Sequence, residues 1–176
     1  MKKETTKKLI VALKILTEKK LLDEISVSEL TNKAKINRGT FYLSYDDFND
    51  FILSIEQELL VGFKKKLIYD FVACGLGEGM VNIFKYIDEN MIIFKIVMLD
   101  GLFLKQFDEA ITAFIRKYNC FNPSLPNEYS QALLLNSTVA IIKIWVFEKK
   151  PRSVKEITNI FYKTRTLSPI NLVTSK

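Results

Sequence analysis

The chain has 176 residues, 48% of them hydrophobic, so it can bury a substantial core and is not expected to be disordered. It contains no histidine, which excludes Ser-His and Cys-His catalysis and removes the usual metal ligand. No run of about 18 uncharged apolar residues and no signal-peptide pattern is present, so we expect a cytoplasmic protein without a membrane span.

The net charge of +6 is distributed unevenly. Residues 1–45 carry ten Lys and Arg against five Asp and Glu, whereas residues 46–63 carry five acids and no base. A small basic segment suits the binding of a polyanion, but solvated surface lysines produce the same balance, so charge alone decides nothing. Cys74 and Cys120 have no redox or metal-ligand spacing, so we expect reduced thiols, no metal and no cofactor.

The first two predicted helices precede residue 35. Apolar residues at helical spacing, among them Leu9 and Leu13, indicate a helix over about residues 5–20. A second helix is predicted to begin at Ser26, because Ser26 and Glu29 have the spacing of a capping box. In that motif each side chain accepts a hydrogen bond from the other residue's backbone N–H.

A tight turn, a short helix and a long helix are predicted next. Asn37 is a suitable N-cap for a third helix over about residues 38–43. Asp46 and Asp47 place negative charge at the positive, N-terminal end of a fourth helix, which we expect to end near Lys66.

The rest of the sequence also has helical periodicity, with helices predicted over residues 80–95, 96–118, 126–149 and 153–165, and Gly101 as a candidate break. The glycine-rich run at residues 75–79 resembles a phosphate-binding loop only superficially, because no strand precedes it and no Lys-Ser/Thr follows it. We expect this run to be a flexible break between two helices.

The string INRGTFYLSY, from Ile36 to Tyr45, has the residues expected of a DNA-recognition helix. Arg38 can bond guanine edges or phosphate, and Gly39 lets the backbone approach DNA closely. The Thr40 and Tyr42 hydroxyls can reach phosphate, while Phe41 and Ile36 point inward. The predicted DNA-binding surface comprises Ser28, Lys35, Asn37, Arg38, Gly39, Thr40, Tyr42 and Ser44.

The run ISVSEL…KAKINRGTFYLSY is similar to the N-terminal head of TetR-type (TetR/AcrR) transcriptional regulators, and INRGTFY closely matches a subgroup with a short helical body. The specific match covers about residues 5–55; beyond it only the layout agrees, including Trp145 and the segment 153–157. The resemblance implies an all-helical homodimer that binds double-stranded DNA at a palindromic operator and is released by a ligand.

Two residues depart from the family's pattern. The subgroup usually has a histidine where Ser44 stands, and the wider family usually has a lysine where Phe48 stands. Both lost groups would contact the DNA backbone, so their loss should weaken salt-dependent affinity without abolishing the fold. A helical dimeric interaction protein of the same fold without specific DNA binding is therefore the alternative to a regulator.

The predicted fold class is all-α, with a helix-turn-helix DNA-binding head over residues 1–47 and a helical ligand-binding and dimerisation domain over residues 48–176. Residues 132–147 are apolar almost all round, which indicates a helix buried on every face, either against a second copy or in a monomer's core. The predicted dimer contacts are Leu135, Val139, Ile142, Trp145, Ile157 and Phe161.

Met and aromatic residues cluster in the middle helices and suit either an ordinary core or a pocket for a small apolar or cationic effector. The predicted pocket residues are Phe84, Met91, Phe94, Met98, Phe103 and Phe107. Together these observations predict a ligand-responsive repressor and not an enzyme.

Overall fold

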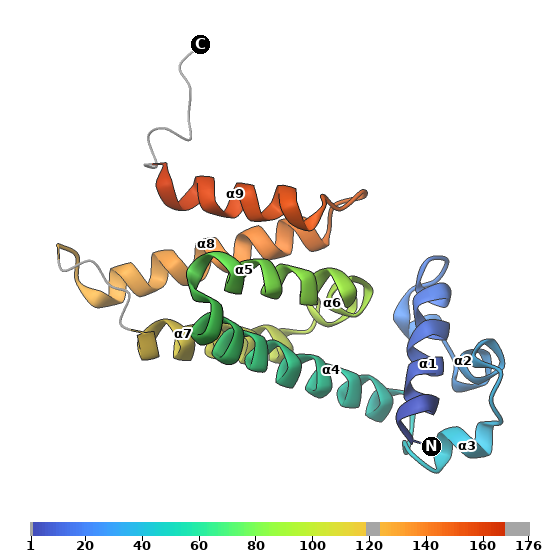
Figure 1. Ribbon diagram of the computed structural model, residues 1–176. Coiled ribbons are helices and arrows are strands. Elements are labelled where there is room, and N and C mark those ends of the chain that lie inside the picture. Colours follow the sequence, from blue (N-terminus) through green and yellow to red (C-terminus); the bar gives the residue numbers. More distant parts are fainter. Residues whose placement is uncertain (1, 119–123, 168–176) are drawn as a thin grey trace. The chain divides into compact units, whose positions relative to one another are not determined.

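The computed structural model describes residues 2–118 and 124–167, and the side chains among them except those of residues 2, 3, 70–76 and 118 (Figure 1). Within these ranges every regular element is a helix, which confirms the predicted all-α class. No helix there is long and apolar enough to cross a bilayer. The chain divides into two compact units, the head up to residue 59 and the body from residue 60.

The head contains α1, α2, α3 and the first part of α4, with a 3-10 turn at Leu22–Glu24. Their bounds are α1 Lys2–Thr17, α2 Val27–Ala34, α3 Arg38–Tyr42 and α4 Phe48–Lys65. Helix α1 begins and ends three residues earlier than predicted, and the residues that follow it, Glu18 to Lys20, are exposed and add no packing. The division at residue 59 lies inside α4, so the domain boundary at residues 47–48 stays a prediction.

An aromatic cluster forms the centre of the head. Phe41 and Phe51 are fully buried and Tyr45 nearly so, with ring centroids 5.1–6.0 Å apart. The Tyr45 hydroxyl lies 2.7 Å from the Thr6 hydroxyl, which joins the start of α1 to the segment after α3. Buried aliphatic side chains, among them that of Leu9, complete the hydrophobic core of the head. Burial of these rings therefore fixes the orientation of α3.

The predicted break at residues 75–79 is wrong. The chain passes from α4 through a π-helical segment, Lys66–Asp70, into α5, Phe71–Glu89, and the glycine run lies inside α5. Glycine permits a helix break but does not require one. Here the Gly77 carbonyl accepts a hydrogen bond from the Tyr162 hydroxyl at 3.0 Å, and α5 packs on α9 in this body.

The remaining body helices are α6 Met91–Val97, α7 Gly101–Tyr118, α8 Asn127–Val146 and α9 Val154–Thr166. The predicted helices over residues 80–95 and 96–118 are corrected, because the chain turns at Asn90 and again before Gly101. The Asn90 side chain donates to the Tyr86 carbonyl, and Asp100 Oδ1 accepts from the Phe103 N–H at 2.8 Å. These polar groups satisfy backbone atoms at the new helix ends. Gly101, which was predicted as a candidate helix break, is the first residue of α7.

Trp145 is fully buried at the centre of the α8–α9 side of the body. Its ring meets Phe84 edge to face at 5.6 Å, and its Nε1 donates to the Arg152 carbonyl at 2.8 Å. A second capping box follows, because the Glu156 carboxylate accepts from the Ser153 N–H at 2.9 Å and the Glu156 N–H donates to the Ser153 hydroxyl. The indole hydrogen bond and the box together fix the turn between α8 and α9.

Candidate nucleic-acid interface

Helix α2 begins with the predicted capping box, which is confirmed. Ser26 Oγ accepts from the Glu29 N–H, and Glu29 Oε2 accepts from the Ser26 N–H, each at 3.2 Å. Lys20 Nζ lies 2.5 Å from Glu29 Oε1. The hydrogen bond from Lys20 and those from Ser26 hold the pKa of Glu29 below its ordinary value. Three groups thus fix where α2 starts.

The turn between α2 and α3 is set by Lys35, whose φ of 54° places it in the left-handed region. Its N–H donates to the Asn32 carbonyl at 3.1 Å, and the Ile36 N–H donates to the Thr31 carbonyl at 3.0 Å. These bonds close the C-terminus of α2 in the way that left-handed caps do. The chain therefore changes direction within a short turn, and α3 begins at Arg38.

Helix α3 has one buried face and one exposed face. Asn37 is its N-cap, as predicted, with Oδ1 accepting from the Gly39 N–H at 2.8 Å. Phe41 points into the head core, whereas Arg38, Gly39 and Tyr42 are exposed. The Arg38 guanidinium carbon lies 6.0 Å from the centroid of the Tyr42 ring, near the outer limit of a cation–π contact. The exposed face therefore presents a cation, a phenol and bare backbone together.

All the predicted DNA-binding residues are at least partly exposed, on α3 or on the segments beside it. Lys35 and Asn37 are exposed, Thr40 is half-buried on α3, and Ser28 and Ser44 are half-buried on the flanking segments. The sequence reasoning missed Leu43, whose side chain is 82% exposed directly after α3. An apolar residue two positions after the inward Phe41, at the end of the motif, was the available signal.

Within the described residues, no packing contact requires position 39 to be a glycine. A Cβ built on it would meet only Asn37 Oδ1, at an ordinary contact distance of 3.4 Å. Its backbone does not occupy the left-handed region, and alanine is the better helix former. The open space beside Gly39 therefore lies outside the head.

Phe48, where the resemblance leads one to expect lysine, is half-buried at the start of α4. Its ring centroid lies 6.3 Å from that of Phe51, so it extends the head's aromatic cluster. The departure thus exchanges a charged group for core packing.

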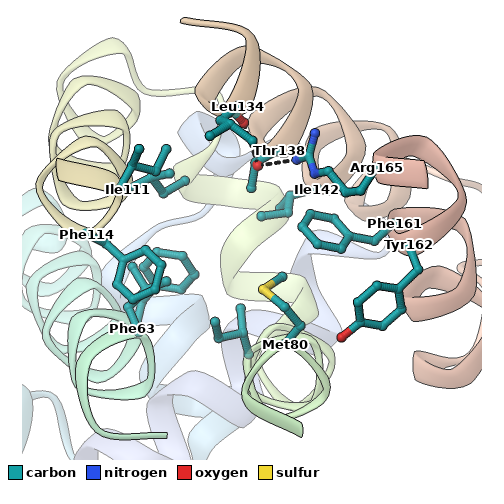
Figure 2. A pocket seen from close by; sticks show the side chains of 13 residues that line it. Phe63, Met80, Ile111, Phe114, Leu134, Thr138, Ile142, Phe161, Tyr162 and Arg165 are labelled. Carbon is teal, nitrogen blue, oxygen red and sulfur yellow. Dashed lines mark hydrogen bonds between the residues drawn. The ribbon is translucent and has the colours of Figure 1, made fainter. Parts of the chain in front are cut away.

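The body contains an apolar cavity of about 290 Å³, shown in Figure 2. Its walls come from α4, the π-helical segment that follows it, α5, α7, α8 and α9. The lining residues are Phe63, Leu67, Met80, Ile83, Ile111, Phe114, Ile115, Leu134, Thr138, Ile142, Phe161, Tyr162 and Arg165. None of the six predicted pocket residues lines it. Phe84, Phe94, Met98, Phe103 and Phe107 are buried and Met91 half-buried in the body, where rings such as Phe94 and Phe107 pack on one another. For these residues the ordinary-core interpretation describes the structure.

Within one chain, helix α8 is not buried on every face, so burial of its open side against a second copy stays a prediction. Tyr129, Leu133 and Ile144 are 64%, 65% and 66% exposed along one side. Of the predicted dimer contacts, only Leu135 and Val139 keep partly open surface. The other four are buried in the chain's own core, because α8 packs on α7, α6 and α9 and its Trp145 ring meets Phe84 of α5; they are Ile142, Trp145, Ile157 and Phe161.

Neither a protein-family model nor a curated protein matches this chain. Among solved structures, it is similar to a TetR transcriptional regulator from Streptococcus agalactiae 2603V, with 18% identity and a TM-score of 0.62 over 92% of this chain and 93% of that one. It is also similar to the dihydroxyacetone kinase operon activator DhaS, with 20% identity and a TM-score of 0.60 over 91% of this chain and 95% of that one. These likenesses show that the chain has the fold of TetR-type transcriptional regulators.

Proposed function

We propose that the protein is a dimeric, DNA-binding transcriptional regulator that represses from a palindromic operator and responds to a ligand. The observation that carries the proposal is the exposed face of α3, which holds Arg38, Tyr42 and a glycine with no internal role. A short helix with small and polar residues at its N-terminus suits the major groove of B-DNA. The TetR-type fold supports this use of the head.

The contacts divide by chemistry. Arg38 is the residue that can read guanine through two parallel hydrogen bonds, and Thr40 can contact a thymine methyl group or a phosphate. Phosphate contacts that position the helix suit five further residues of α2, α3 and the turns beside them, all at least partly exposed: Ser28, Lys35, Asn37, Tyr42 and Ser44. Gly39 lets the backbone of α3 approach the groove. Leu43 adds an apolar contact at the far end of the helix.

The exposed side of α8 supports assembly with a second copy. Four exposed residues recur at intervals of one or two helical turns along α8: Tyr129, Leu133, Ala140 and Ile144. A two-fold axis would place this side of α8 against the same side of the partner. The predicted contacts Leu135 and Val139 lie on the other side of α8, nearer the buried Ile142. Two heads in one dimer then read two half-sites, which explains why we propose a palindrome.

The first test is selection of operator sequences from random DNA by the purified full chain. We expect an enriched palindrome with half-site centres about 34 Å apart. Arg38→Ala should lose about 1–3 kcal/mol of specific binding and relax the base preference at one position, and Thr40→Ala should lose less. Arg116→Ala, which removes an exposed arginine from the body, is the matched control. Failure to enrich any palindrome would overturn the proposal.

Gly39→Ala separates fold from DNA contact. Because the added methyl group meets only Asn37 Oδ1, the head should keep its stability or gain up to about 1 kcal/mol. Affinity for the selected operator should nevertheless fall, since the methyl group occupies space reserved for the groove. Gly101→Ala in α7, where a Cβ meets nothing within 4 Å, should leave operator affinity unchanged. Unchanged affinity in Gly39→Ala would remove α3 as the groove-binding element.

The second candidate is a helical dimeric interaction protein of the same fold that does not bind specific DNA. The packed ring of Phe48 favours it, because it stands where a lysine would contact the DNA backbone. A mobility-shift assay with the selected DNA and with DNA upstream of the protein's own gene decides between the two. Phe48→Lys should strengthen binding and steepen the salt dependence by about one phosphate contact. Repression, as opposed to activation, is tested with a reporter gene placed behind the selected operator; increased expression would contradict it.

A further inference from the structure

Among the described residues, one charged side chain, that of Arg165, lines the apolar cavity of the body. Figure 2 shows it reaching from α9 toward Thr138 on α8. The other lining side chains are hydrophobic apart from the hydroxyls of Thr138 and Tyr162, and none is acidic. The cavity therefore has an apolar interior and one fixed positive group at its wall.

Arg165 is held in place from two directions. Its two terminal nitrogens donate to the hydroxyls of Ser137 and Thr138, the latter at 2.5 Å, and its guanidinium carbon lies 4.6 Å from the centroid of the Phe161 ring. Within the described residues no carboxylate pairs with it. Two of its five N–H donors are used by these bonds, which leaves three for another acceptor.

The surroundings of Arg165 favour an anion. Burial lowers the pKa of Arg165, yet a guanidinium stays protonated in proteins, so this half-buried charge has no counter-ion among the residues that the structure describes. A cationic effector would meet this charge with no acidic group among the described lining residues to offset it. A carboxylate would instead accept two parallel hydrogen bonds from the planar guanidinium.

We propose that this cavity binds an amphipathic carboxylate, with its carboxylate on Arg165 and an apolar body of roughly a dozen carbons inside. The size follows from the volume, because a cavity of about 150 Å³ accommodates benzene and this one has about 290 Å³. The regulatory consequence rests on the proposed function. Phe63 and Leu67 line the cavity, and Phe63 belongs to α4, the helix that continues from the head into the body. Occupation of the cavity thus acts directly on the helix shared by the two units.

The binding test uses the full chain without DNA and three probes with one twelve-carbon chain: dodecanoate, dodecanol and dodecyltrimethylammonium, titrated calorimetrically below their micelle concentrations. We expect dodecanoate to bind at least about tenfold more tightly than dodecanol, which corresponds to one charge-assisted hydrogen bond, and the ammonium probe not to bind. Equal affinity for dodecanoate and dodecanol, or preference for the ammonium probe, would overturn the proposal.

Arg165→Gln should abolish the preference for dodecanoate over dodecanol while leaving dodecanol affinity unchanged. Lys163→Gln, which removes an exposed charge from the same helix outside the cavity wall, is the matched control and should preserve the preference. If Arg165→Gln fails to fold, Thr138→Val removes one bond that orients the guanidinium and should reduce the preference in part. A preference that survives in folded Arg165→Gln or is untouched by Thr138→Val would overturn the role of Arg165.

Operator binding is then measured with and without dodecanoate. Because the calorimetry contains no DNA, loss of the carboxylate preference contradicts the ligand proposal alone, whereas failure to select an operator contradicts the proposed function alone. Both proposals together require that dodecanoate lowers operator affinity in the wild-type chain and that this effect disappears in Arg165→Gln. An operator affinity that does not respond to bound dodecanoate would overturn the regulatory consequence.

Discussion

The head and the body are both helical, but different kinds of contact stabilise them. The helix ends of the head are fixed by near neighbours in sequence, such as Ser26 with Glu29 and Asn37 with the Gly39 N–H. The body also has such helix ends, as at Ser153 with Glu156, but around its cavity it adds hydrogen bonds between distant segments, such as Tyr162 with Gly77 and Arg165 with Ser137. A unit whose helix ends are capped by residues close in sequence can present a rigid recognition surface. A unit assembled from segments that are distant in sequence can surround a cavity.

The largest expected effect comes from removing the central ring of the head. Phe41→Ala should cost about 3–5 kcal/mol, because Phe41 is fully buried against Tyr45 and Phe51. If the units are energetically separate, the circular dichroism signal should begin to fall at lower urea concentration. Fluorescence of Trp145, the chain's single tryptophan and a body residue, should keep its midpoint.

Two controls sharpen that experiment. Phe84→Ala removes a ring that contacts Trp145 and should shift the fluorescence midpoint strongly. Leu43→Ala, at an exposed position, should change neither signal by more than about 0.5 kcal/mol. If Phe41→Ala moves both signals together, the two units unfold as one block and their energetic separation is refuted.

The next effect concerns close packing in the body. A Cβ on Gly62 would lie 2.1 Å from the Tyr86 hydroxyl oxygen and 2.7 Å from its ring carbon Cζ, so Gly62→Ala forces Tyr86 to move. We expect a loss of about 1–3 kcal/mol, as for other overpacked sites, read from the Trp145 fluorescence midpoint. The double variant with Tyr86→Leu should recover part of the loss, and Gly101→Ala should lose nothing. An unchanged stability in Gly62→Ala would mean that the Tyr86 side chain moves aside without an energetic cost.

The sequence was sufficient where structure depends on near neighbours. Both the Ser26 box and the Asn37 cap could be predicted, because the donor and acceptor lie within three residues of each other. The glycine run was misjudged, since the partner of the Gly77 carbonyl lies 85 residues away. The Asp100 cap of α7 also joins residues three positions apart, so it was open to prediction from the sequence, but it was not predicted.

The sites follow the same division. The exposed side of α3 could be predicted from one motif, whereas the cavity could not be distinguished from core by composition. Phe94 and Phe161 are both buried rings, yet only Phe161 borders the cavity. Arg165 belongs to no motif, and its importance appears only when α8 and α9 bring it beside Thr138. The sequence likewise could not show which side of α8 faces the chain's own core; Ile142 and Trp145 are buried there because neighbouring helices pack on that side.

A smaller effect compares the same motif in the two units. Ser26→Ala in the head and Ser153→Ala in the body each remove the hydroxyl of a capping box and should each cost about 1 kcal/mol. Ser153→Ala should shift the Trp145 fluorescence midpoint, whereas Ser26→Ala should speed amide hydrogen exchange in α2 and leave that midpoint in place. Ser→Asp at either position keeps an acceptor and should preserve stability. A fluorescence shift in Ser26→Ala would show that the boxes are coupled.

The smallest effect separates the two box carboxylates by pH and salt. Hydrogen bonding, from Lys20 first for Glu29 and from Ser153 first for Glu156, holds the pKa of each below its ordinary value of 4.5. A lowered folded-state pKa stabilises the folded chain above the unfolded value, and this stabilisation is lost as pH falls from about 4.5 through the folded pKa. Carboxyl resonances followed by NMR should therefore titrate below 4.5 at both residues.

The two carboxylates should then respond differently to salt. Glu29 is paired with the exposed ammonium of Lys20, so about 1 M NaCl should raise its midpoint more than that of Glu156, for which Arg152 is the smallest contribution. Lys20→Met should raise the pKa of Glu29 and remove its salt response while leaving Glu156 unchanged. Equal salt responses in the wild-type chain would mean that hydrogen bonds from serine, and not the lysine, dominate both boxes, so that the start of α2 owes nothing to charge.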